Sequence, residues 1–508
     1  MKNENITEAW RQYEVGREYN RHIGLYETVR RNERFYRGDH WYGTETDLPR
    51  PVFNLVRRIT DYLVASIVPD DLSIHYTDDK IPFLDNSELR TRVTDGIGIL
   101  NRNAAYRWKR SGMRALSHKA LLNAAVSGDG VFYCWWDNAY RDGQPFHGDV
   151  HTDLVDNTDF FVADVANTDV QSQEYLILAG RASVEALRLE ASENGGDPTL
   201  IGPDTEDEAQ SGDLASIEQD GREKATYLIR FFREGDEVIF EKSTRKCVLR
   251  RVNTGLRYYP VAYFNWHPTK GCFHGTAPVS DMIANQKYIN TAYAMAMKHM
   301  YDTAFSKVIY DKTRIPEWTN EVGEAIAAVG GGNVGDAVSV LGVGQLQEGY
   351  LDLIASVIEN TKAMMGATEA ALGDAEANNT SAILVLQEAS RIALEQVASD
   401  FCRCIGEVAS IWADMLCTYC PPERLLVTSD ENGQQAEHPD YRLLREELLR
   451  ASAEVTKVGS YTPAATVTLL DKLLDAGHIN VKQYVELLPA GTVSDRDTLL
   501  KALEKKGT

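Results

Sequence analysis

The sequence has no long apolar run, few cysteines, and fewer basic than acidic side chains. Its apolar stretches, such as residues 62–68 and 338–343, are far shorter than the ~18 residues that cross a bilayer, so no membrane-spanning helix is expected. The seven cysteines are an odd number in a long chain, which argues against a secreted disulfide framework. No apolar core of a signal peptide follows residues 1–5. We therefore expect a soluble protein made in a reducing compartment.

The shortage of basic side chains restricts what the protein can bind. Lys and Arg together number 53, against 75 Asp and Glu, so the formal net charge is −22. Binding to phosphates needs clustered Lys and Arg, so tight wrapping around DNA is disfavoured. With 43% apolar and 9% aromatic residues, the remaining composition excludes collagen-like and mostly disordered chains. Because a single core stops growing near ~250–300 residues, a chain of 508 residues predicts two or more domains.

The first half of the chain combines helical patterns with a block of short strands. Residues 54–68 read as an amphipathic helix, since Leu55, Ile59 and Leu63 recur at a spacing of four. Further helices are expected at 7–35, 87–102 and 106–125. After the turn at 127–130, runs rich in β-branched and aromatic residues predict an antiparallel β module with strands at 131–136, 160–165, 175–178, 226–232, 237–241 and 257–264. Residues 192–222, crowded with Asp, Glu and Gly, predict a poorly ordered acidic surface excursion.

Long helical patterns dominate the second half. With Pro278 in its first turn, one helix is predicted over 276–303, and another over 347–365. Between them, 304–346 holds short β-like runs around a glycine-rich turn. After a small-residue acidic loop, residues 380–420 predict the longest helix. Its buried stripe comprises Leu386, Ala393, Val397, Phe401, Cys404, Val408, Ile411 and Met415. Short helices, with caps at 462–463, Gly477 and Ser494, are expected within 421–508.

Four cysteines near the end of the longest helix raise the question of a zinc site. Cys402, Cys404, Cys417 and Cys420 form a C-x-C and a C-x-x-C pair, and tetrahedral thiolate sites use paired cysteines. However, residues two apart on a helix point in different directions, and Cys404 falls in the buried stripe. Buried cysteine is also a common small hydrophobic residue. No metal is therefore assigned to these residues.

A second candidate metal site is the alternating run His147, Asp149, His151 and Asp153. On a strand, all four side chains would face one side, and such a group can hold a divalent cation. The alternative is a solvated strand or loop in a Gly/Asp-rich neighbourhood. A cytoplasmic metal-dependent enzyme built on His147, Asp149 and His151 therefore stands as a rival hypothesis.

Other motifs of enzymes and DNA-reading proteins lack the required pattern. The glycine-rich turn at 330–335 is followed by Asp336, where a phosphate-binding loop needs Gly-Lys-Ser/Thr. Residues 462–488 have the outline of a helix-turn-helix. However, residues 440–508 contain ten basic and ten acidic side chains, so this region has no net positive charge with which to bind DNA. No zincin pair, nucleophile elbow or dinucleotide fingerprint occurs. The sequence predicts no catalytic residue, no cofactor and no metal.

The helices on either side of 304–346 carry the most informative pattern. The first has a coiled-coil-like seam of Met282, Gln286, Ile289, Tyr293, Ala296 and Met300. A different face of it carries a narrow polar stripe of Lys287, Thr291, Ala294 and Lys298. The second helix has a matching seam of Tyr350, Leu353, Ile354, Val357 and Met364. Together they predict an antiparallel hairpin, whose polar stripe would suit a water-filled lumen if several copies formed a ring.

The order of these segments resembles the portal proteins of tailed double-stranded DNA bacteriophages, which form the ring at one capsid vertex. The resemblance covers nearly the whole chain and depends on a succession of short motifs rather than on one of them. These are Tyr36-Arg37-Gly38, the 54–68 helix, YPVAYF at 259–264, GTAPVS at 275–280 and QKYIN at 286–290.

The resemblance implies an α+β protein with the phage portal fold. That fold has a mainly helical wing with an antiparallel β module, a two-helix stem, a small α/β clip, a long wing helix and a helical C-terminal crown. The implied divisions are a wing over 1–275 that includes the acidic excursion, a first stem helix over 276–303, a clip over 304–346, a second stem helix over 347–365, a tunnel loop over 366–379, a long wing helix over 380–420 and a crown-side region over 421–508.

The resemblance also implies partners and a location. The family forms a ring, a dodecamer in the virion, that conducts double-stranded DNA without reading its sequence, during genome packaging and ejection. Its partners are the terminase, which hydrolyses ATP, the head–tail connector, and the major capsid and scaffolding proteins, with no catalytic activity and no membrane. Assembly in the host cytoplasm and residence at the portal vertex of the virion are therefore expected. Head-to-tail contacts in a ring require two different complementary faces on each subunit.

Candidate site residues follow from position within this scheme. On the stem, Lys287, Thr291 and Lys298 are expected to face the DNA channel. In the tunnel loop, the residues expected nearest DNA are Thr368, Glu369, Asp374, Glu376, Asn378 and Asn379. In the clip, the residues expected to dock partners are Lys312, Arg314, Glu317, Trp318 and Glu321.

An acidic wall with sparse lysines lets a duplex slide, because tight phosphate contacts would hold it in place. For Lys287 and Lys298, the alternative is a solvated helix face or an intersubunit salt bridge. A further alternative for the whole chain is another non-enzymatic ring or scaffold protein of a virus particle, which would lack the hairpin.

Overall fold

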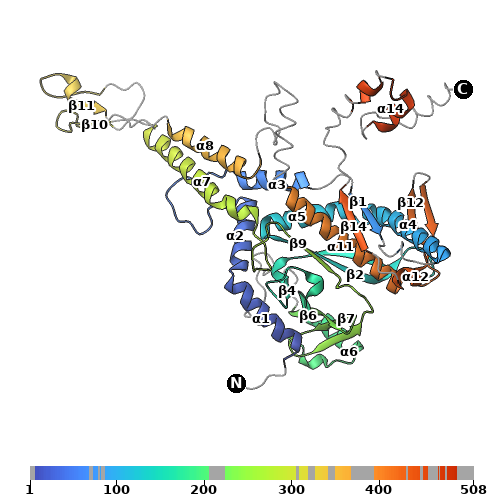
Figure 1. Cartoon of the computed structure of the whole chain (residues 1–508). Coiled ribbons are helices and arrows are strands. Elements are labelled where there is room, and N and C mark those ends of the chain that lie inside the picture. The colour runs from blue at the N-terminus through green and yellow to red at the C-terminus, as the bar shows by residue number, and fades with distance from the viewer. Residues whose placement is uncertain are drawn as a thin grey trace.

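In the computed structural model, two antiparallel sheets and their surrounding helices form a body from which a helical hairpin projects (Figure 1). The structure describes residues 6–67, 72–77, 81, 86–204, 223–304, 308–318, 326–340, 349–367, 394–430, 433–446, 450–455, 467, 470–474 and 477–488. Their mixture of helices and antiparallel strands confirms the predicted α+β class. Within these residues, no helix has the length and apolar character needed to cross a membrane.

Three helices open the chain where helical patterns were predicted. Two helices, α1 (Glu8–His22) and α2 (Leu25–Arg37), replace the single stretch expected at 7–35, because Gly24 takes a positive φ of 68° between them. The 54–68 prediction is confirmed by α3 (Leu55–Ile67).

The next two helices, α4 (Ser87–Arg110) and α5 (Met113–Ser127), differ from the expected boundaries. The predicted break between 102 and 106 is wrong, because Asn103 and Ala104 are buried and continue the inner face of α4. The chain turns instead at Gly112, whose φ of 62° favours glycine.

Two sheets form the β module predicted after residue 128. The first has the strand order β3 (His147–Val155), β2 (Asp129–Arg141), β9 (Val261–Asn265). The second has the order β4 (Phe160–Val162), β5 (Tyr175–Ser183), β6 (Lys224–Glu234), β7 (Glu237–Ser243), β8 (Val248–Asn253). The β8 strand was not predicted, since Leu249 is its only buried side chain. The strand expected from residue 257 begins later, because the amides of Arg257 and Tyr258 donate to Asp414 instead of to a neighbouring strand.

Part of the expected acidic excursion packs onto the five-stranded sheet. Residues 192–193 end α6 (Val184–Glu193), and Ile201 is buried in a small apolar cluster. Asp204 accepts hydrogen bonds from Thr226 and pairs with Arg181 at 3.3 Å. The prediction of poor order is thus wrong for 192–204, which an apolar side chain and a paired carboxylate anchor to the sheet. Residues 205–222 lie outside the described ranges.

The first helix docks onto the same sheet. Trp10 and Tyr13 of α1 are buried against it. Thr7, the N-cap of α1, ties the helix start to the β7–β8 turn: its Oγ1 donates to the Thr244 carbonyl at 3.1 Å, and its amide donates to the Arg245 carbonyl at 3.0 Å. The N-terminus of α1 is therefore fixed by a turn far along the chain.

The described part of the long helix, α11 (Glu395–Tyr419), runs through the main hydrophobic core. The predicted stripe is buried at Val397, Phe401, Cys404, Val408, Ile411 and Met415, while Leu386 and Ala393 lie outside the described ranges. Phe401 meets Phe264 of β9 edge to face, with ring centroids 5.5 Å apart. This contact joins α11 to the three-stranded sheet.

Strands occur within 421–508, where only short helices were expected. A hairpin is formed by β12 (Leu426–Asp430) and β13 (Gly433–Glu437), and β14 (Arg450–Val455) pairs with β1 (Leu72–Thr77). Since β1 is distant in sequence, no local pattern indicated this pairing. Two helices, α12 (Tyr441–Glu446) and α14 (Val481–Leu487), are also described, and Gly477 takes the positive φ expected at a helix cap. The caps predicted at 462–463 and Ser494 lie outside the described ranges.

Candidate stem hairpin and its junction with the wing

The predicted antiparallel hairpin is formed by α7 (Pro278–Thr303) and α8 (Gly349–Met364), which we call the stem hairpin. We call the two sheets, α1–α6 and α11 the wing. Figure 1 shows the stem hairpin leading away from the wing toward β10 (Val308–Tyr310) and β11 (Val338–Val340). Asn285 donates to Thr361 Oγ1 at 3.0 Å, and Tyr350 donates to the Ala292 carbonyl at 3.1 Å. These contacts define the sides on which the two helices meet.

The predicted apolar seams are only partly covered within one chain. On α7, the seam residues Met282, Gln286, Ile289 and Ala296 are buried, whereas Met300 is 60% exposed. On α8, Ile354 is buried, whereas Leu353 is 50% and Met364 is 74% exposed. A single subunit therefore leaves much of its own seam uncovered.

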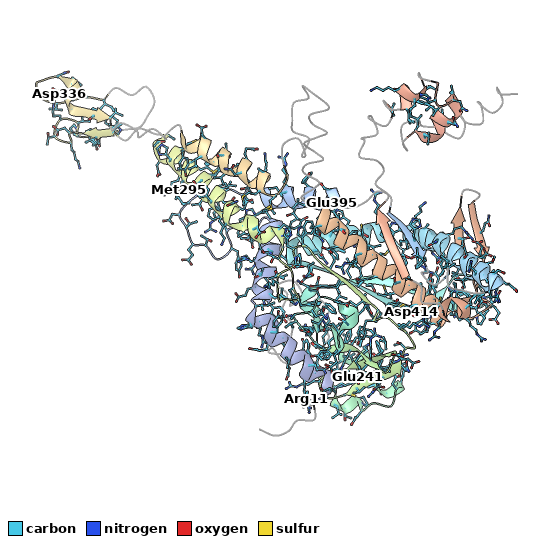
Figure 2. All side chains as sticks on the ribbon, in the orientation of Figure 1. Arg11, Glu241, Met295, Asp336, Glu395 and Asp414 are labelled. Carbon is cyan, nitrogen blue, oxygen red and sulfur yellow. The ribbon has the colours of Figure 1, made fainter. Side chains whose placement is uncertain are left out.

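Four exposed apolar side chains gather on one flank of the stem hairpin. Tyr288 and Met295 lie two turns apart on α7, and Leu353 and Met364 lie three turns apart on α8, so each pair shares one side of its helix. Each of the four residues follows a residue of the α7–α8 contact by three positions, which is a rotation of about 60° around the helix axis. Because the two helices are antiparallel, the same rotation on each helix brings both pairs to one flank of the hairpin. Figure 2 shows Met295 on the stem hairpin, away from the sheets. Apolar groups exposed together in this way mark a contact surface.

The predicted polar stripe lies on the side of α7 away from α8. Lys287 is exposed, and Thr291 and Lys298 are half-buried. Ala294, expected in the same stripe, is fully buried, so the polar stripe is interrupted at this position. The Lys287 ammonium lies 5.7 Å from the centre of the Phe35 ring on α2, a distance typical of a cation–π contact. One end of the stripe therefore touches the wing.

Gln286 joins the stem hairpin to the wing through three hydrogen bonds and makes a fourth within α7. Its side-chain oxygen accepts from the amides of Leu55 (2.9 Å) and Val56 (3.2 Å), which have no acceptor within α3 because they stand at its start. Its Nε2 donates to the Phe53 carbonyl (2.8 Å) and to Asn290 Oδ1 (2.9 Å). Gln286 is 1% exposed, so water cannot replace these partners.

Asn290 extends this network to His40. Its Nδ2 lies 2.9 Å from His40 Nδ1, and His40 Nε2 lies 2.9 Å from the Phe35 carbonyl oxygen. Because a carbonyl oxygen only accepts, Nε2 carries the proton and Nδ1 accepts from Asn290. Burial lowers the pKa of His40, which keeps the ring neutral. The sequence signal for this network was a pair of amides, Gln286 and Asn290, one turn apart on the buried side of a helix.

A second buried network lies where the wing leads into α7. Asp129 is 1% exposed, and its Oδ2 lies 2.7 Å from His274 Nδ1. The same carboxylate accepts hydrogen bonds from the side chains of Asn157, Tyr263 and Asn265 and from the amide of Gly275. Burial, with this carboxylate adjacent, raises the pKa of Tyr263, so the hydroxyl keeps the proton it donates.

Two glycines allow that junction to close. Gly128 has a φ of 104°, and a Cβ atom at this position would collide with the carbonyl oxygen of Gly275. The backbone preceding β2 and the backbone preceding α7 therefore meet directly. The sequence pattern placed Gly128 in a turn and Gly275 in the GTAPVS motif, without indicating that the two glycines meet.

The described part of the expected clip is a small two-stranded unit. Antiparallel pairing sets Val308 opposite Val340, which confirms the predicted β-like runs. Ile315 is buried inside the unit, whereas Ile309 and Val334 are more than half exposed. The unit therefore presents apolar side chains to its surroundings.

Four of the five predicted docking residues are described. Trp318 stacks on Tyr310 with ring centroids 5.3 Å apart, and Arg314 donates to the Asn333 carbonyl at 3.2 Å. Lys312 and Glu317 are exposed. The remaining predicted site residues, Glu321 of the clip and Thr368, Glu369, Asp374, Glu376, Asn378 and Asn379 of the tunnel loop, lie outside the described ranges.

The alternating run on β3 is engaged in protein contacts. Asp149 pairs with the buried guanidinium of Arg107 at 2.7 Å, and Asp153 accepts from Trp135 Nε1 at 2.7 Å. His151 stacks on Trp135 with ring centroids 5.2 Å apart. These contacts favour a structural strand over a metal site.

Three of the four cysteines considered for zinc, Cys404, Cys417 and Cys420, are buried, and Cys402 is half-buried. Cys404 is fully buried, as the helical stripe predicted. Burial raises the pKa of Cys417 to about 12 and of Cys420 to about 11, which disfavours the thiolate form that zinc binds. No group of three or more His, Cys, Asp and Glu side chains in the described ranges is placed to hold a metal ion.

A comparison with protein families supports the resemblance seen in the sequence. The sequence profile of the phage P22-like portal protein family matches residues 254–442. No curated protein sequence matches the chain. One similar solved structure, a chain of the virion of a native gene transfer agent particle, is 10% identical over 86% of this chain and 89% of its own, with a TM-score of 0.39. The family match confirms the predicted similarity to phage portal proteins.

Proposed function

We propose that this protein is a phage portal protein, whose copies form a ring at one capsid vertex and conduct double-stranded DNA during packaging and ejection. The family match over residues 254–442 carries the proposal. It begins just before β9 and extends over the stem hairpin, β10, β11 and α11, which are the segments assigned to the stem, the clip and the long wing helix.

The stem hairpin supplies surfaces suited to a ring. One flank exposes Tyr288, Met295, Leu353 and Met364, and the opposite flank exposes Met300 and Leu351. A head-to-tail contact joins two different faces, so two unlike apolar flanks on one hairpin suit a closed ring. We propose that the first flank of one subunit packs against the second flank of its neighbour. The number of copies, twelve, is taken from the resemblance.

The sparse charge on the outer side of α7 suits a sliding duplex. Asp352, Ser356 and Glu359 are exposed on α8, opposite its contact with α7, and therefore point away from the outer side of α7. We propose that Lys287, Thr291 and Lys298 on α7 reach the channel as weak phosphate contacts, and that the acidic tunnel loop lies nearest the duplex. Since DNA carries a charge every ~1.7 Å, only sparse cations allow it to move without being held.

The clip is the proposed docking unit for the terminase and the head–tail connector, through Lys312, Arg314, Glu317, Trp318 and Glu321. Its exposed apolar residues and the stacked Trp318–Tyr310 pair support this role, because aromatic side chains anchor many protein interfaces. The wing is the proposed contact for the major capsid and scaffolding proteins. Assembly in the host cytoplasm and residence in the virion follow from this role.

Electron micrographs of the purified protein test the ring directly. We expect rings with a central hole. A particle that stays monomeric at high concentration, with stoichiometric zinc or manganese in elemental analysis, would instead support the rival metal enzyme at His147, Asp149 and His151.

Charge reversal tests the channel assignment. Lys287→Glu combined with Lys298→Glu should reduce DNA packaging into heads and change its salt dependence. Lys270→Glu, at an exposed lysine outside the stem hairpin, should leave both unchanged. Because Lys287 also touches Phe35, Lys298→Glu alone separates a channel effect from a disturbed wing. Packaging and salt dependence equal to wild type in the double variant would remove the lysines from the channel.

A further inference from the structure

A cavity of about 310 Å³ lies in the wing, between the C-terminal end of α4, β3 and the segment that enters β12. Its cationic lining is Arg107, Arg110 and Arg424, and its other polar lining includes Tyr140 and Ser111. The volume is at the lower end of the range for small-molecule sites. No residue of the stem hairpin lines this cavity, so the proposed channel does not account for it.

Two of these arginines keep donors that no protein group uses within the described ranges. Arg107 is 7% exposed and pairs through Nη1 with Asp149, but its Nε is buried with no acceptor in the described structure. The Arg110 guanidinium lies over the rings of Tyr106 (5.9 Å) and Tyr140 (5.0 Å), and within the described ranges it meets no carboxylate. A buried guanidinium N–H without an acceptor is costly unless a ligand supplies one.

Arg424 differs because both of its terminal nitrogens donate to protein acceptors. Its Nη2 donates to Asp142 at 3.0 Å, and its Nη1 donates to the Gly148 carbonyl. Arg424 therefore contributes charge and shape to the cavity wall, while Arg107 and Arg110 supply the free donors.

The cavity keeps an excess of positive charge. Three arginines face two carboxylates, Asp142 and Asp149. The C-terminal dipole of α4 removes about half a unit of charge, and Lys109 in its last turn more than restores it. Residues 101–120 include six Lys and Arg and no Asp or Glu, in a chain whose net charge is −22. The elbow between α4 and α5 is thus a local cationic region of an acidic protein.

We propose that this cavity binds a phosphate group, held by the free donors of Arg107 and Arg110, with Tyr140 and Ser111 as neutral donors. Guanidinium groups match phosphate oxygens, and a tetrahedral group can accept from donors that approach from several directions. A planar carboxylate would pair with one guanidinium group and leave the donors of the other arginine without an acceptor. The phosphate can belong to a free phosphate ester or to the backbone of DNA.

Calorimetric titration of the full-length protein at low salt tests the proposal. Inorganic phosphate and deoxyadenosine monophosphate should each bind at least about ten times more tightly than acetate. Arg110→Ala should weaken phosphate binding about tenfold or more. Arg11→Ala, at an exposed arginine on α1 far from the cavity (Figure 2), is the matched control and should bind as wild type does.

Arg107→Lys is the second variant, because a lysine can keep an ion pair with Asp149 but has no Nε–H group. It should fold and lose part of the phosphate affinity. Equal phosphate affinity in wild type and Arg110→Ala, or acetate binding as tight as phosphate, would overturn the proposal. Competition by a 20-base-pair duplex would assign the site to DNA backbone, and its absence would assign it to a free phosphate ester.

Discussion

His274 Nδ1 lies 2.7 Å from Asp129 Oδ2, and both side chains are almost completely buried. The pair connects the first residue of β2 with the segment that precedes α7, so the wing and the stem hairpin share one polar anchor. Desolvation offsets much of the attraction in such a site, so its value lies in fixing geometry. Removing one partner should nevertheless lower the free energy of unfolding, because the remaining polar groups stay buried without their hydrogen bonds.

Loss of the Asp129 carboxylate should destabilise the whole wing. Asp129→Ala removes the acceptor of five donors, and we expect the free energy of unfolding to fall by about 3–5 kcal/mol in urea denaturation. Asp352→Ala, at an exposed aspartate of α8, should change it by less than about 0.5 kcal/mol. Similar losses in both variants would contradict the role given to the buried network.

Gln286 should decide how firmly α7 is held by α3. Gln286→Leu introduces an apolar side chain of similar size and leaves the amide of Val56 without its acceptor, whereas the amide of Leu55 keeps the Phe53 carbonyl at 2.8 Å, so we expect a loss of about 1–3 kcal/mol. Hydrogen exchange of the Val56 amide should accelerate more than that of amides within α5. Gln286→Glu keeps the acceptor and should preserve more of its protection. Unchanged exchange in Gln286→Leu would show that the cap is dispensable.

His40 should make stability fall in mild acid. Its pKa in the folded state is below the ordinary value of 6.5, so the unfolded chain binds the proton first. Stability is therefore complete above pH ~6.5 and declines as the pH drops toward the folded-state pKa. In urea unfolding between pH 7.5 and 5, His40→Asn should show a shallower decline than wild type. His118→Asn, at an exposed histidine, should keep the wild-type decline.

Glu407 on α11 should have the opposite dependence on pH. Burial raises its pKa from the ordinary 4.5 to about 7, although Arg403 at 3.4 Å opposes the shift. The folded state therefore favours the protonated carboxyl, which stabilises fully below pH 4.5 and loses its benefit as the pH rises through 7. Glu407→Gln should be about 1–3 kcal/mol more stable than wild type at pH 8, with a much smaller difference at pH 5. A constant difference across this range would contradict the shifted pKa.

A charge on the exposed flank of the stem hairpin should prevent ring formation. Met295→Glu places a carboxylate in the proposed subunit contact, where burying it unpaired would be unfavourable. Analytical ultracentrifugation should show rings for wild type and monomers for this variant. The variant monomer should have the same melting temperature as a wild-type monomer. Leu189→Glu, at a side chain of α6 that is 62% exposed, should still form rings. Rings formed by both variants would place the subunit contact elsewhere.

Local periodicity was sufficient to predict the stem hairpin and the buried side of α11. Met282 and Ile289 on α7 and Phe401 on α11 each belong to a run of apolar residues at helical spacing, so their burial follows from the pattern alone. The same spacing placed Ala294 with the lysines, because a helical wheel records direction but not what covers each face. Seam exposure at Leu353 and Met364 likewise depends on partners outside the helix.

Pairings between distant segments could not be predicted in this way. The strands β1 (LSIHYT) and β14 (RASAEV) both alternate between apolar and polar residues, but alternation within six residues does not identify a partner strand so far away in the sequence. The polar junctions are similar: Asp129 and His274 occur in unremarkable local sequence, and Gln286 was placed on the seam of its helix without any indication of its partners. Their role appears only when the chain brings them together, so the sequence indicated the helices at the junction but not the hydrogen bonds that hold it.

The tie between Thr7 and the β7–β8 turn also has a consequence for synthesis. Thr7 and its acceptor Thr244 are 237 residues apart, so the first helix leaves the ribosome long before its docking site exists. At ~5–20 residues per second, the delay is on the order of ten seconds or more. Throughout that time Trp10 and Tyr13 have no sheet to cover them, which makes the nascent amino-terminal helix a natural client for a chaperone.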